Sequence, residues 1–239
     1  MHAHPGAASG SSGLDVAIAA QGLYHIYRES EVETVALRGA DLALQRGSWT
    51  SLMGPSGSGK STLMQVMAGL LEPSGGAVMV DGRDLTRLAP PERARWRRSR
   101  IGVVLQRDNL HPLLNVADNV ALPMRIDGRG AAEIGPRVAE LLTRLGLSER
   151  RRHAAGALSG GEAQRAAIAV ALAPRPEVLL ADEPTGELDE ATASEVLDLL
   201  AATCERDGTT VLTVTHNGQV AERAHKHVAM RDGLVIDDE

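Results

Sequence analysis

The sequence predicts an α/β fold, because short apolar runs typical of buried strands alternate with segments of helical periodicity. The run Trp49-Thr50-Ser51-Leu52-Met53 is followed by a glycine-rich loop and a predicted helix over residues 60–68. Three later runs are predicted to be strands, at residues 101–105, 178–183 and 209–215. With 239 residues, the chain can form one large domain, or a domain with a subdomain, around a substantial core.

The loop after the first strand, Gly54-Pro55-Ser56-Gly57-Ser58-Gly59-Lys60-Ser61, fits the phosphate-binding pattern G-x-x-x-x-G-K-[ST] at every position. Its glycines let successive backbone N–H groups turn toward phosphate oxygens, at a helix N-terminus that favours anions. Lys60 is expected to reach the β- and γ-phosphates, and the Ser61 hydroxyl to bind Mg²⁺. The other cations of the chain, apart from Lys226, are arginines, so the lysine kept here supports the motif.

Composition excludes several classes of function. A net charge of −6 gives no overall attraction to nucleic acid, and 2% aromatic residues are too few for a base-stacking surface, so no nucleic acid partner is expected. Cys204 is the only cysteine, which excludes an internal disulfide. No run approaches the ~20 apolar residues that span a bilayer, and residues 1–13 are predicted to be a disordered tail rather than a signal peptide. The chain is therefore expected in the cytoplasm or on the cytoplasmic face of a membrane.

The region before the loop is predicted to be β-rich, with short strands and a hairpin at residues 16–18, 24–28 and 35–44. Tyr27 lies in this region and could stack on an adenine ring or be a half-buried strand residue, and its spacing leaves both interpretations open. After the loop helix, residues 72–76 are predicted to form a turn and residues 77–80 a strand. The helix that begins at Pro90 carries an arginine run, which we interpret as a solvated face rather than a nucleic-acid patch.

A helical insertion is predicted over about residues 107–160. Within it, Gly135-Pro136 is expected to begin a new helix, with Pro136 in the first turn. Gln106, just before the insertion, leaves a core strand opposite the phosphate loop. Its amide could therefore touch Mg²⁺ or the attacking water.

The segment Leu158-Ser159-Gly160-Gly161-Glu162 is expected to open a further helix. Ser159 is a candidate N-cap, and the two glycines leave the helix N-terminus open to a second anion. The chain thus has two predicted phosphate-binding helix starts but one loop lysine. This difference suggests that the second start completes the site of another copy.

Two carboxylates follow the apolar strand at residues 178–181. Asp182 is expected to bind Mg²⁺ directly or through water, and Glu183 to orient and deprotonate water for attack on the γ-phosphate. Acidic pairs are also common at strand ends, but here they follow a complete phosphate loop. A helix is predicted over residues 190–205, and His216 ends the next strand, at the edge where ligands bind in open α/β sheets.

In this order, the motifs resemble the ATP-binding cassette (ABC) family, from about Asp15 to the C-terminus. The specific feature is Leu-Ser-Gly-Gly-Glu at 158–162, which lies between Gln106 and Asp182-Glu183 and is followed by His216. The resemblance implies an ABC ATPase domain over residues 14–239. Its expected fold is a P-loop NTPase (RecA-like) core with an N-terminal antiparallel β-subdomain and an inserted α-helical subdomain.

The resemblance also implies a role for each matching residue. Glu183 is similar to the catalytic base, His216 to the switch histidine and Gln106 to the Q-loop glutamine. Lys60 completes the expected catalytic set, and the expected Mg²⁺ site is Ser61, Gln106 and Asp182. The expected contacts with ATP are Tyr27, Gly54, Pro55, Ser56, Gly57, Ser58, Gly59, Lys60, Ser61, Thr62 and Asp189. Those with the γ-phosphate held by a partner subunit are Ser159, Gly160 and Gly161.

Finer features are similar to the ATPases of lipoprotein-release and macrolide-export systems, notably Thr185-Gly186-Glu187-Leu188-Asp189 and Asn119-Val120-Ala121-Leu122-Pro123. The branch implies a homodimer that closes head-to-tail over two Mg-ATP and drives a separate integral-membrane permease, at the cytoplasmic face of the cell membrane. Export, or extraction of a lipid, lipoprotein, peptide or drug, would be the transport activity. A soluble ABC ATPase of cofactor assembly and a cell-division cassette that signals without transport are the alternatives.

Three positions depart from the family pattern. Val170 stands where an arginine is usual, Leu105 replaces an aromatic residue, and Gly135-Pro136 is expected to interrupt a helix that is continuous in relatives. No catalytic group is lost through these changes. Transmission to a membrane partner is the property they could alter.

Overall fold

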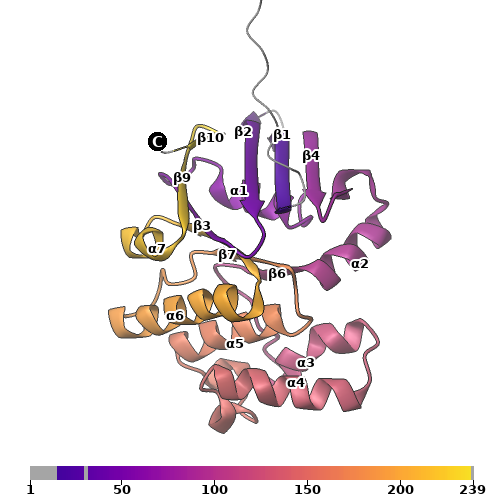
Figure 1. The fold of residues 1–239 in the computed structure, drawn as a ribbon, viewed down its shortest axis with the longest axis vertical. Coiled ribbons are helices and arrows are strands. Elements are labelled where there is room, and N and C mark those ends of the chain that lie inside the picture. Colours follow the sequence, from indigo (N-terminus) through magenta and orange to yellow (C-terminus); the bar gives the residue numbers. More distant parts are fainter. Residues whose placement is uncertain (1–14, 30–31, 238–239) are drawn as a thin grey trace, which may run out of the picture.

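In the computed structural model, which describes residues 15–29 and 32–237, the strands form two sheets (Figure 1). The antiparallel sheet has the order β2-β1-β4-β5 and comprises β1 (Val16–Glu29), β2 (Val32–Gln45), β4 (Gly75–Val80) and β5 (Arg83–Asp84). The second sheet has the order β10-β9-β3-β8-β7-β6 and comprises β3 (Trp49–Met53), β6 (Ile101–Val104), β7 (Val178–Asp182), β8 (Thr210–Thr215), β9 (Lys226–Arg231) and β10 (Leu234–Asp237). The tail predicted at residues 1–13 lies outside the described residues.

Parallel pairing places the carboxyl ends of five strands at the same edge of the second sheet. Strands β9, β3, β8, β7 and β6 pair in parallel, and β10 joins β9 in the antiparallel sense. The register places Met53 opposite Thr215 and Asp182 opposite Val214. The carboxyl ends of β3, β7 and β8 therefore meet side by side, and the residues that follow these strands are brought together.

Helix α1 (Lys60–Met67) lies between the two sheets and contacts strands of both, including β1, β2, β7 and β8. Its side chains Leu63, Met64 and Met67 are fully buried, as expected for a helix that is covered on several sides. The helix predicted at residues 60–68 is thus confirmed, with Ala68 as its C-cap.

The other face of the second sheet is covered by α5 (Gly160–Leu172) and α6 (Glu190–Asp207), seen below the strands in Figure 1. Successive residues of β7 point to opposite faces of the sheet. Leu179 and Ala181 accordingly belong to the core cluster of these helices, whereas Val178 and Leu180 belong to the cluster around α1. The predicted α/β fold is confirmed.

The antiparallel sheet differs from the prediction in two respects. Residues 16–18 and 24–28 belong to one long strand, β1, which continues through register shifts near Gly22. Strand β4 begins at Gly75, within the predicted turn. Gly76 allows β4 to pass close to β1, because a Cβ on Gly76 would lie only 2.6 Å from the Gln21 carbonyl oxygen and 2.4 Å from that of Gly22. Since β4 and β5 follow α1 in the chain, the β-subdomain is not built from N-terminal residues alone.

The insertion contains α3 (Val116–Ile126) and α4 (Ala131–Arg144). The prediction that Gly135-Pro136 begins a helix is wrong, because α4 starts at Ala131 and continues through Pro136. Proline removes one N–H donor from the helix ladder. Burial of Val138, Leu141 and Leu142 along one face of α4 favours the continuous helix despite this loss.

Helix α2 (Pro90–Arg100) carries the arginine run, and the structure pairs several of its members within the chain. Arg93 contacts Glu72, and Arg98 contacts Asp127 at 3.1 Å. These ion pairs support the interpretation of the run as a solvated face.

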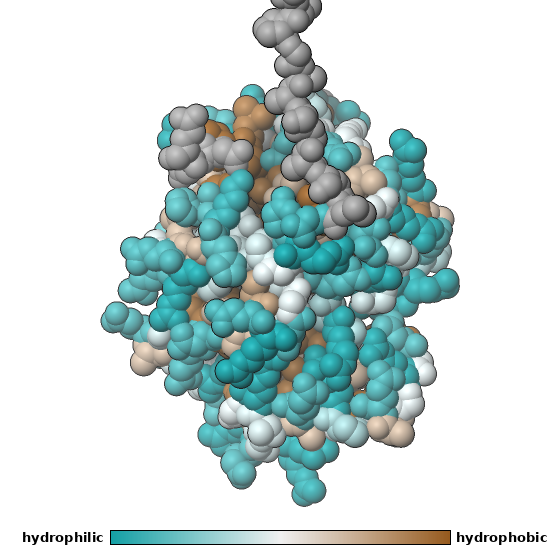
Figure 2. Space-filling view, in the orientation of Figure 1, coloured by the Kyte–Doolittle hydropathy of each residue, from teal (hydrophilic) through white to brown (hydrophobic). Residues whose placement is uncertain are grey.

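The sequence does not predict helix α7 (Gly218–Arg223) or strands β9 and β10, because their apolar residues form no long periodic run. The face drawn in Figure 2 is mainly hydrophilic, and its most hydrophobic area lies at the end that carries β2 and β10. No helix in the described part of the chain has the length and apolar character needed to cross a bilayer.

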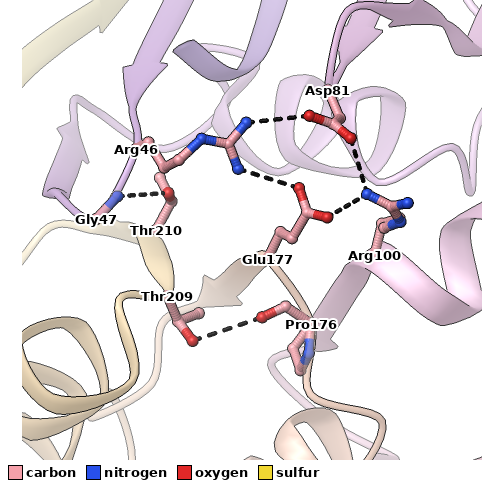
Figure 3. Close-up of polar contacts among 8 residues, drawn as sticks. All are labelled: Arg46, Gly47, Asp81, Arg100, Pro176, Glu177, Thr209 and Thr210. Carbon is pink, nitrogen blue, oxygen red and sulfur yellow. Dashed lines mark hydrogen bonds and ion pairs between the residues drawn. The ribbon is translucent and has the colours of Figure 1, made fainter. Parts of the chain in front are cut away.

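A four-residue ion cluster joins the two sheets at the amino ends of the parallel strands (Figure 3). Arg46, which follows β2, contacts Asp81 at 3.1 Å and Glu177 at 3.2 Å. Arg100, the last residue of α2, contacts the same two carboxylates, with 2.8 Å to Asp81. The hydrogen bond to Glu177 raises the pKa of Arg46 against the opposing effect of desolvation, and the charges of Glu177 and Asp81 act in the same direction as the hydrogen bond.

We predict that Glu177→Gln lowers the free energy of unfolding by about 1 kcal/mol, because one carboxylate that serves two arginines is lost while solvent exposure limits the effect. Urea denaturation at low and high salt measures the loss, which should shrink as salt screens the cluster. Glu33→Gln, in the exposed Arg28–Glu33 pair, is the matched control and should cost less. An equal cost for the two variants would contradict the prediction.

Candidate active site

The carboxyl edge of the parallel strands opens into a cleft of about 710 Å³, here called the phosphate cleft. Its lining combines the predicted loop with residues from β1, β2 and three other strand ends. They are Tyr27, Thr34, Val35, Ala36, Gly54, Pro55, Ser56, Gly57, Gly59, Lys60, Ser61, Thr62, Gln106, Glu183, Val214 and His216. The structure therefore brings together most of the residues that the sequence assigned to one site.

The glycines of the loop serve two different purposes. A Cβ at Gly54 would lie 2.2 Å from the Met230 carbonyl oxygen, and one at Gly59 would lie 2.5 Å from that of Ala36. Glycine is thus required at these two positions so that the loop can pack against β9 and β2. Gly57 has no such neighbour within 4 Å, and its open side leaves room for a phosphate at the backbone.

Lys60 is buried and stabilises the conformation of the phosphate loop. Its ammonium donates to the carbonyl oxygens of Gly54 at 2.8 Å and Pro55 at 2.9 Å. The positive charge is therefore fixed at the concave side of the loop, where phosphate oxygens would be attracted to it.

Asp182 ends β7 in a buried position, with 6% of its surface exposed. Burial raises the pKa of its carboxyl group, against the opposing effect of the Ser61 hydroxyl. Its Oδ1 atom has no hydrogen-bond partner among the described residues. A buried carboxylate oxygen without a hydrogen-bond partner can bind a cation, and the Ser61 hydroxyl beside it is a second oxygen ligand. Mg²⁺ prefers such oxygen ligands.

Glu183 turns away from the strand through a backbone conformation that is rare for its residue type. Its φ of 47° lies in the left-handed region, which costs about 1 to 2 kcal/mol for a residue with a Cβ. Its N–H donates to the Val214 carbonyl oxygen at 2.8 Å, so the next strand, β8, holds the turn in place. The side chain consequently points into the phosphate cleft instead of continuing the strand.

The Glu183 carboxylate is held by two neighbours from the end of β8. The Thr215 hydroxyl donates to Oε2 at 3.1 Å, and His216 Nδ1 donates to Oε1 at 2.7 Å. Thr215 is fully buried, whereas the His216 side chain is largely exposed. The sequence motifs do not assign Thr215 to the site. The signal that could have found it is a polar residue at the carboxyl end of the strand beside Asp182.

Tyr27 lies at the mouth of the phosphate cleft, 38% exposed, and its hydroxyl is 3.3 Å from the Thr62 hydroxyl. Its ring meets His25 edge to face, with 4.6 Å between the ring centroids. His25 is itself anchored, because its Nδ1 donates to the Glu72 carbonyl oxygen at 3.1 Å. An aromatic face held at a cleft mouth favours the stacking interpretation of Tyr27 over that of a structural strand residue.

Six predicted residues do not line the phosphate cleft: Ser58 and Asp182 are buried next to residues that line it, and the other four lie at the starts of α5 and α6. Ser159 is the N-cap of α5 and forms a capping box with Glu162. Gly160 lines a neighbouring cleft of about 490 Å³, which shares Gln106, Glu183 and His216 with the phosphate cleft. Gly161 is buried against α6, and Asp189 is the N-cap of α6. Within one chain, the start of α5 is therefore separate from the phosphate loop.

Known proteins are similar in sequence to this chain over most of its length. Residues 37–186 match the family model described as ABC transporter, a range that contains the phosphate loop, the start of α5 and Glu183. The lipoprotein-releasing system ATP-binding protein LolD 2 of Caulobacter vibrioides is 43% identical over 220 residues, which cover 92% of this chain and 96% of that protein. The macrolide export ATP-binding/permease protein MacB of Syntrophobacter fumaroxidans is 42% identical over 90% of this chain, which spans only 30% of MacB.

Solved structures extend the similarity to the whole fold. The ATP-binding cassette MJ0796, solved as a dimer in a post-hydrolysis state with ADP and Pi, superimposes with a TM-score of 0.87 and 37% identity. That comparison covers 93% of this chain and 97% of the MJ0796 chain. The family match, the identity to LolD 2 and the similarity of the whole fold to MJ0796 show that the chain belongs to the ABC transporter family, as a nucleotide-binding ATPase subunit.

Proposed function

We propose that two copies of this chain close head-to-tail over two ATP molecules and drive a separate integral-membrane permease. The observation that carries this proposal is the separation, in one chain, of the phosphate loop from the start of α5. Only one of these two phosphate-binding elements lines the phosphate cleft. A second copy, turned around, would supply the missing element to each site.

Different residues in and beside the phosphate cleft bind the adenine ring, the phosphates and Mg²⁺. Tyr27 stacks on the adenine ring, and the backbone around Gly57 surrounds the phosphates. Lys60 contacts the β- and γ-phosphate oxygens. Ser61, Gln106 and Asp182 would hold Mg²⁺, which when bound supplies positive charge to the phosphate oxygens.

Glu183 acts as the general base for hydrolysis. Its carboxylate takes a proton from water, the water oxygen bonds to the γ-phosphorus, and the bond to the bridging oxygen breaks to release ADP. Thr215 and His216 fix the direction of the carboxylate, since each contacts one of its oxygens. Lys60 stabilises the negative charge on the transferred group.

In the proposed dimer, the start of α5 binds the ATP of the other copy through an exposed hydroxyl donor and an exposed backbone. The Ser159 hydroxyl accepts a hydrogen bond from the Glu162 N–H, which leaves its own proton to donate to a phosphate oxygen. Gly160 is exposed beside it. Domain 14–239, with its helical insertion at about 107–160, is the unit that we expect to dimerise.

The permease is proposed to be a separate integral-membrane chain that holds this ATPase subunit at the cytoplasmic face of the cell membrane. MacB is named as an ATP-binding/permease protein, and this chain matches only a fraction of its length. LolD is named as the ATP-binding protein of a lipoprotein-releasing system. By analogy, the substrate would be a lipid, lipoprotein, peptide or drug that is exported or extracted.

Affinity purification from native membranes in mild detergent tests this part of the proposal. A co-purifying protein with membrane spans and a large extracytoplasmic domain is the expected result. Recovery of soluble assembly proteins alone would contradict the transporter proposal and favour cofactor assembly.

We predict that Glu183→Gln lowers ATP hydrolysis by about 100-fold or more, because an amide cannot accept the proton of the attacking water. ATP should still bind, so the variant should accumulate as a dimer in ATP. Phosphate release and light scattering measure the two effects. Glu187→Gln, in the exposed Arg107–Glu187 pair of the same loop, is the control and should hydrolyse ATP normally. Wild-type turnover by Glu183→Gln would refute the assignment of the base.

We predict that the Thr215 hydroxyl contributes to kcat because it orients the Glu183 carboxylate. Thr215→Val removes the donor to Glu183 Oε2 but preserves the shape of the side chain, so kcat should fall about tenfold. Binding of a fluorescent ATP analogue should not change, since Thr215 does not line the phosphate cleft. Thr215→Ser retains the hydroxyl and should recover most of kcat. A fall in ATP affinity with unchanged kcat would contradict this role.

A further inference from the structure

Two adjacent glycines at the start of α5 have different surroundings. A Cβ built on Gly161 would lie 2.2 Å from the Thr192 Cγ2 atom, closer than two carbon atoms can approach. A Cβ on Gly160 would meet only the Leu188 Cδ2 atom, at an ordinary distance of 3.8 Å. Gly161 is buried, whereas Gly160 is exposed. The packing of this chain therefore requires glycine at 161 but not at 160.

Thr192 cannot easily turn its methyl group away from Gly161. Its hydroxyl donates to Asp189 Oδ2 at 2.7 Å, and its backbone N–H donates to Asp189 Oδ1 at 3.1 Å. A β-branched side chain with its hydroxyl bound has one preferred χ1 rotamer. The hydrogen bonds from Thr192 also lower the pKa of the Asp189 carboxyl group.

We propose that Thr192 is a positioning residue that seats the start of α5 on α6. Its hydroxyl fixes the Asp189 end of the loop that follows Glu183, and its methyl group occupies the space left by the missing side chain of Gly161. Gly161 is accordingly a glycine because of Thr192 rather than because of a phosphate. The loop from Glu183 to Asp189 and the start of α5 are thereby held as one unit.

The consequence for activity rests on the proposed function, in which the start of α5 binds the ATP of the second copy. A methyl group at 161 would push α5 away from α6. Ser159 and Glu162, joined in the capping box, would be displaced together with the helix. The donors aimed at the partner's phosphate would then lose their alignment.

The test uses the full chain with Glu183→Gln, so that ATP-bound dimers accumulate. Gly161→Ala should weaken ATP-dependent dimerisation by about tenfold or more and lower the thermal unfolding midpoint by about 5 °C. Adding Thr192→Ser removes Cγ2 but keeps the hydroxyl that binds Asp189. This double change should restore both properties to near the level of Thr192→Ser alone.

Two controls separate packing from ligand contact. Thr192→Val keeps the Cγ2 methyl group and replaces the hydroxyl with a second methyl group, so it should not rescue Gly161→Ala. Gly160→Ala should weaken dimerisation without changing the unfolding midpoint, and Thr192→Ser should not rescue it. Light scattering with and without ATP gives the dimer affinity, and binding of a fluorescent ATP analogue checks that the phosphate loop is intact.

The proposal is overturned if Gly161→Ala matches the parent in both measurements, or if Thr192→Ser fails to restore it. A parent that stays monomeric in ATP would instead refute the head-to-tail dimer. In that case the unfolding midpoints alone decide the role of Thr192, because they do not depend on dimerisation.

Discussion

Parallel pairing of β3, β8 and β7 is the constraint on which the site depends. Hydrogen bonds between these strands set Met53 beside Thr215 and Val214 beside Asp182, so three chain segments that are distant in sequence end together. A slip of one residue would turn the side chains of a strand to the opposite face. The fixed register is what allows Thr215 and His216 from one strand end to hold the Glu183 carboxylate from another.

The register is in turn maintained by cores on both faces of the sheet. These cores contain no phenylalanine, and they are filled by aliphatic side chains from α1 on one face and from α5 and α6 on the other. Trp49 is an exception, and its buried indole N–H is satisfied by the Thr213 hydroxyl at 3.1 Å. At the amino ends of the strands, the cluster around Glu177 joins the antiparallel sheet to the same core. The carboxyl edge of the parallel strands, where the phosphate cleft lies, is thus at the opposite end of the sheet from a charged connection between the two sheets.

The loop from Glu183 to Asp189, together with the first turn of α6, connects Glu183 to the start of α5. Glu183 begins it in a strained conformation, and Asp189 ends it as the N-cap of α6. Through Thr192, this loop is packed directly against Gly161. In a head-to-tail dimer, a change at one Glu183 would therefore reach a helix start that serves the other ATP.

The sequence by itself determined the features that depend on local chemistry. The phosphate loop, the strands at 49–53 and 178–182, the cap at Ser159 and the order of the site residues follow from residue type and spacing. Tertiary structure alone decided that α4 continues through Pro136, that β4 and β5 join the N-terminal strands, and that Thr215 holds Glu183. It also distinguished Gly161 from Gly160, which the motif treats alike. These features arise from contacts between residues far apart in the chain, where burial and steric fit outweigh the local preferences that a sequence displays.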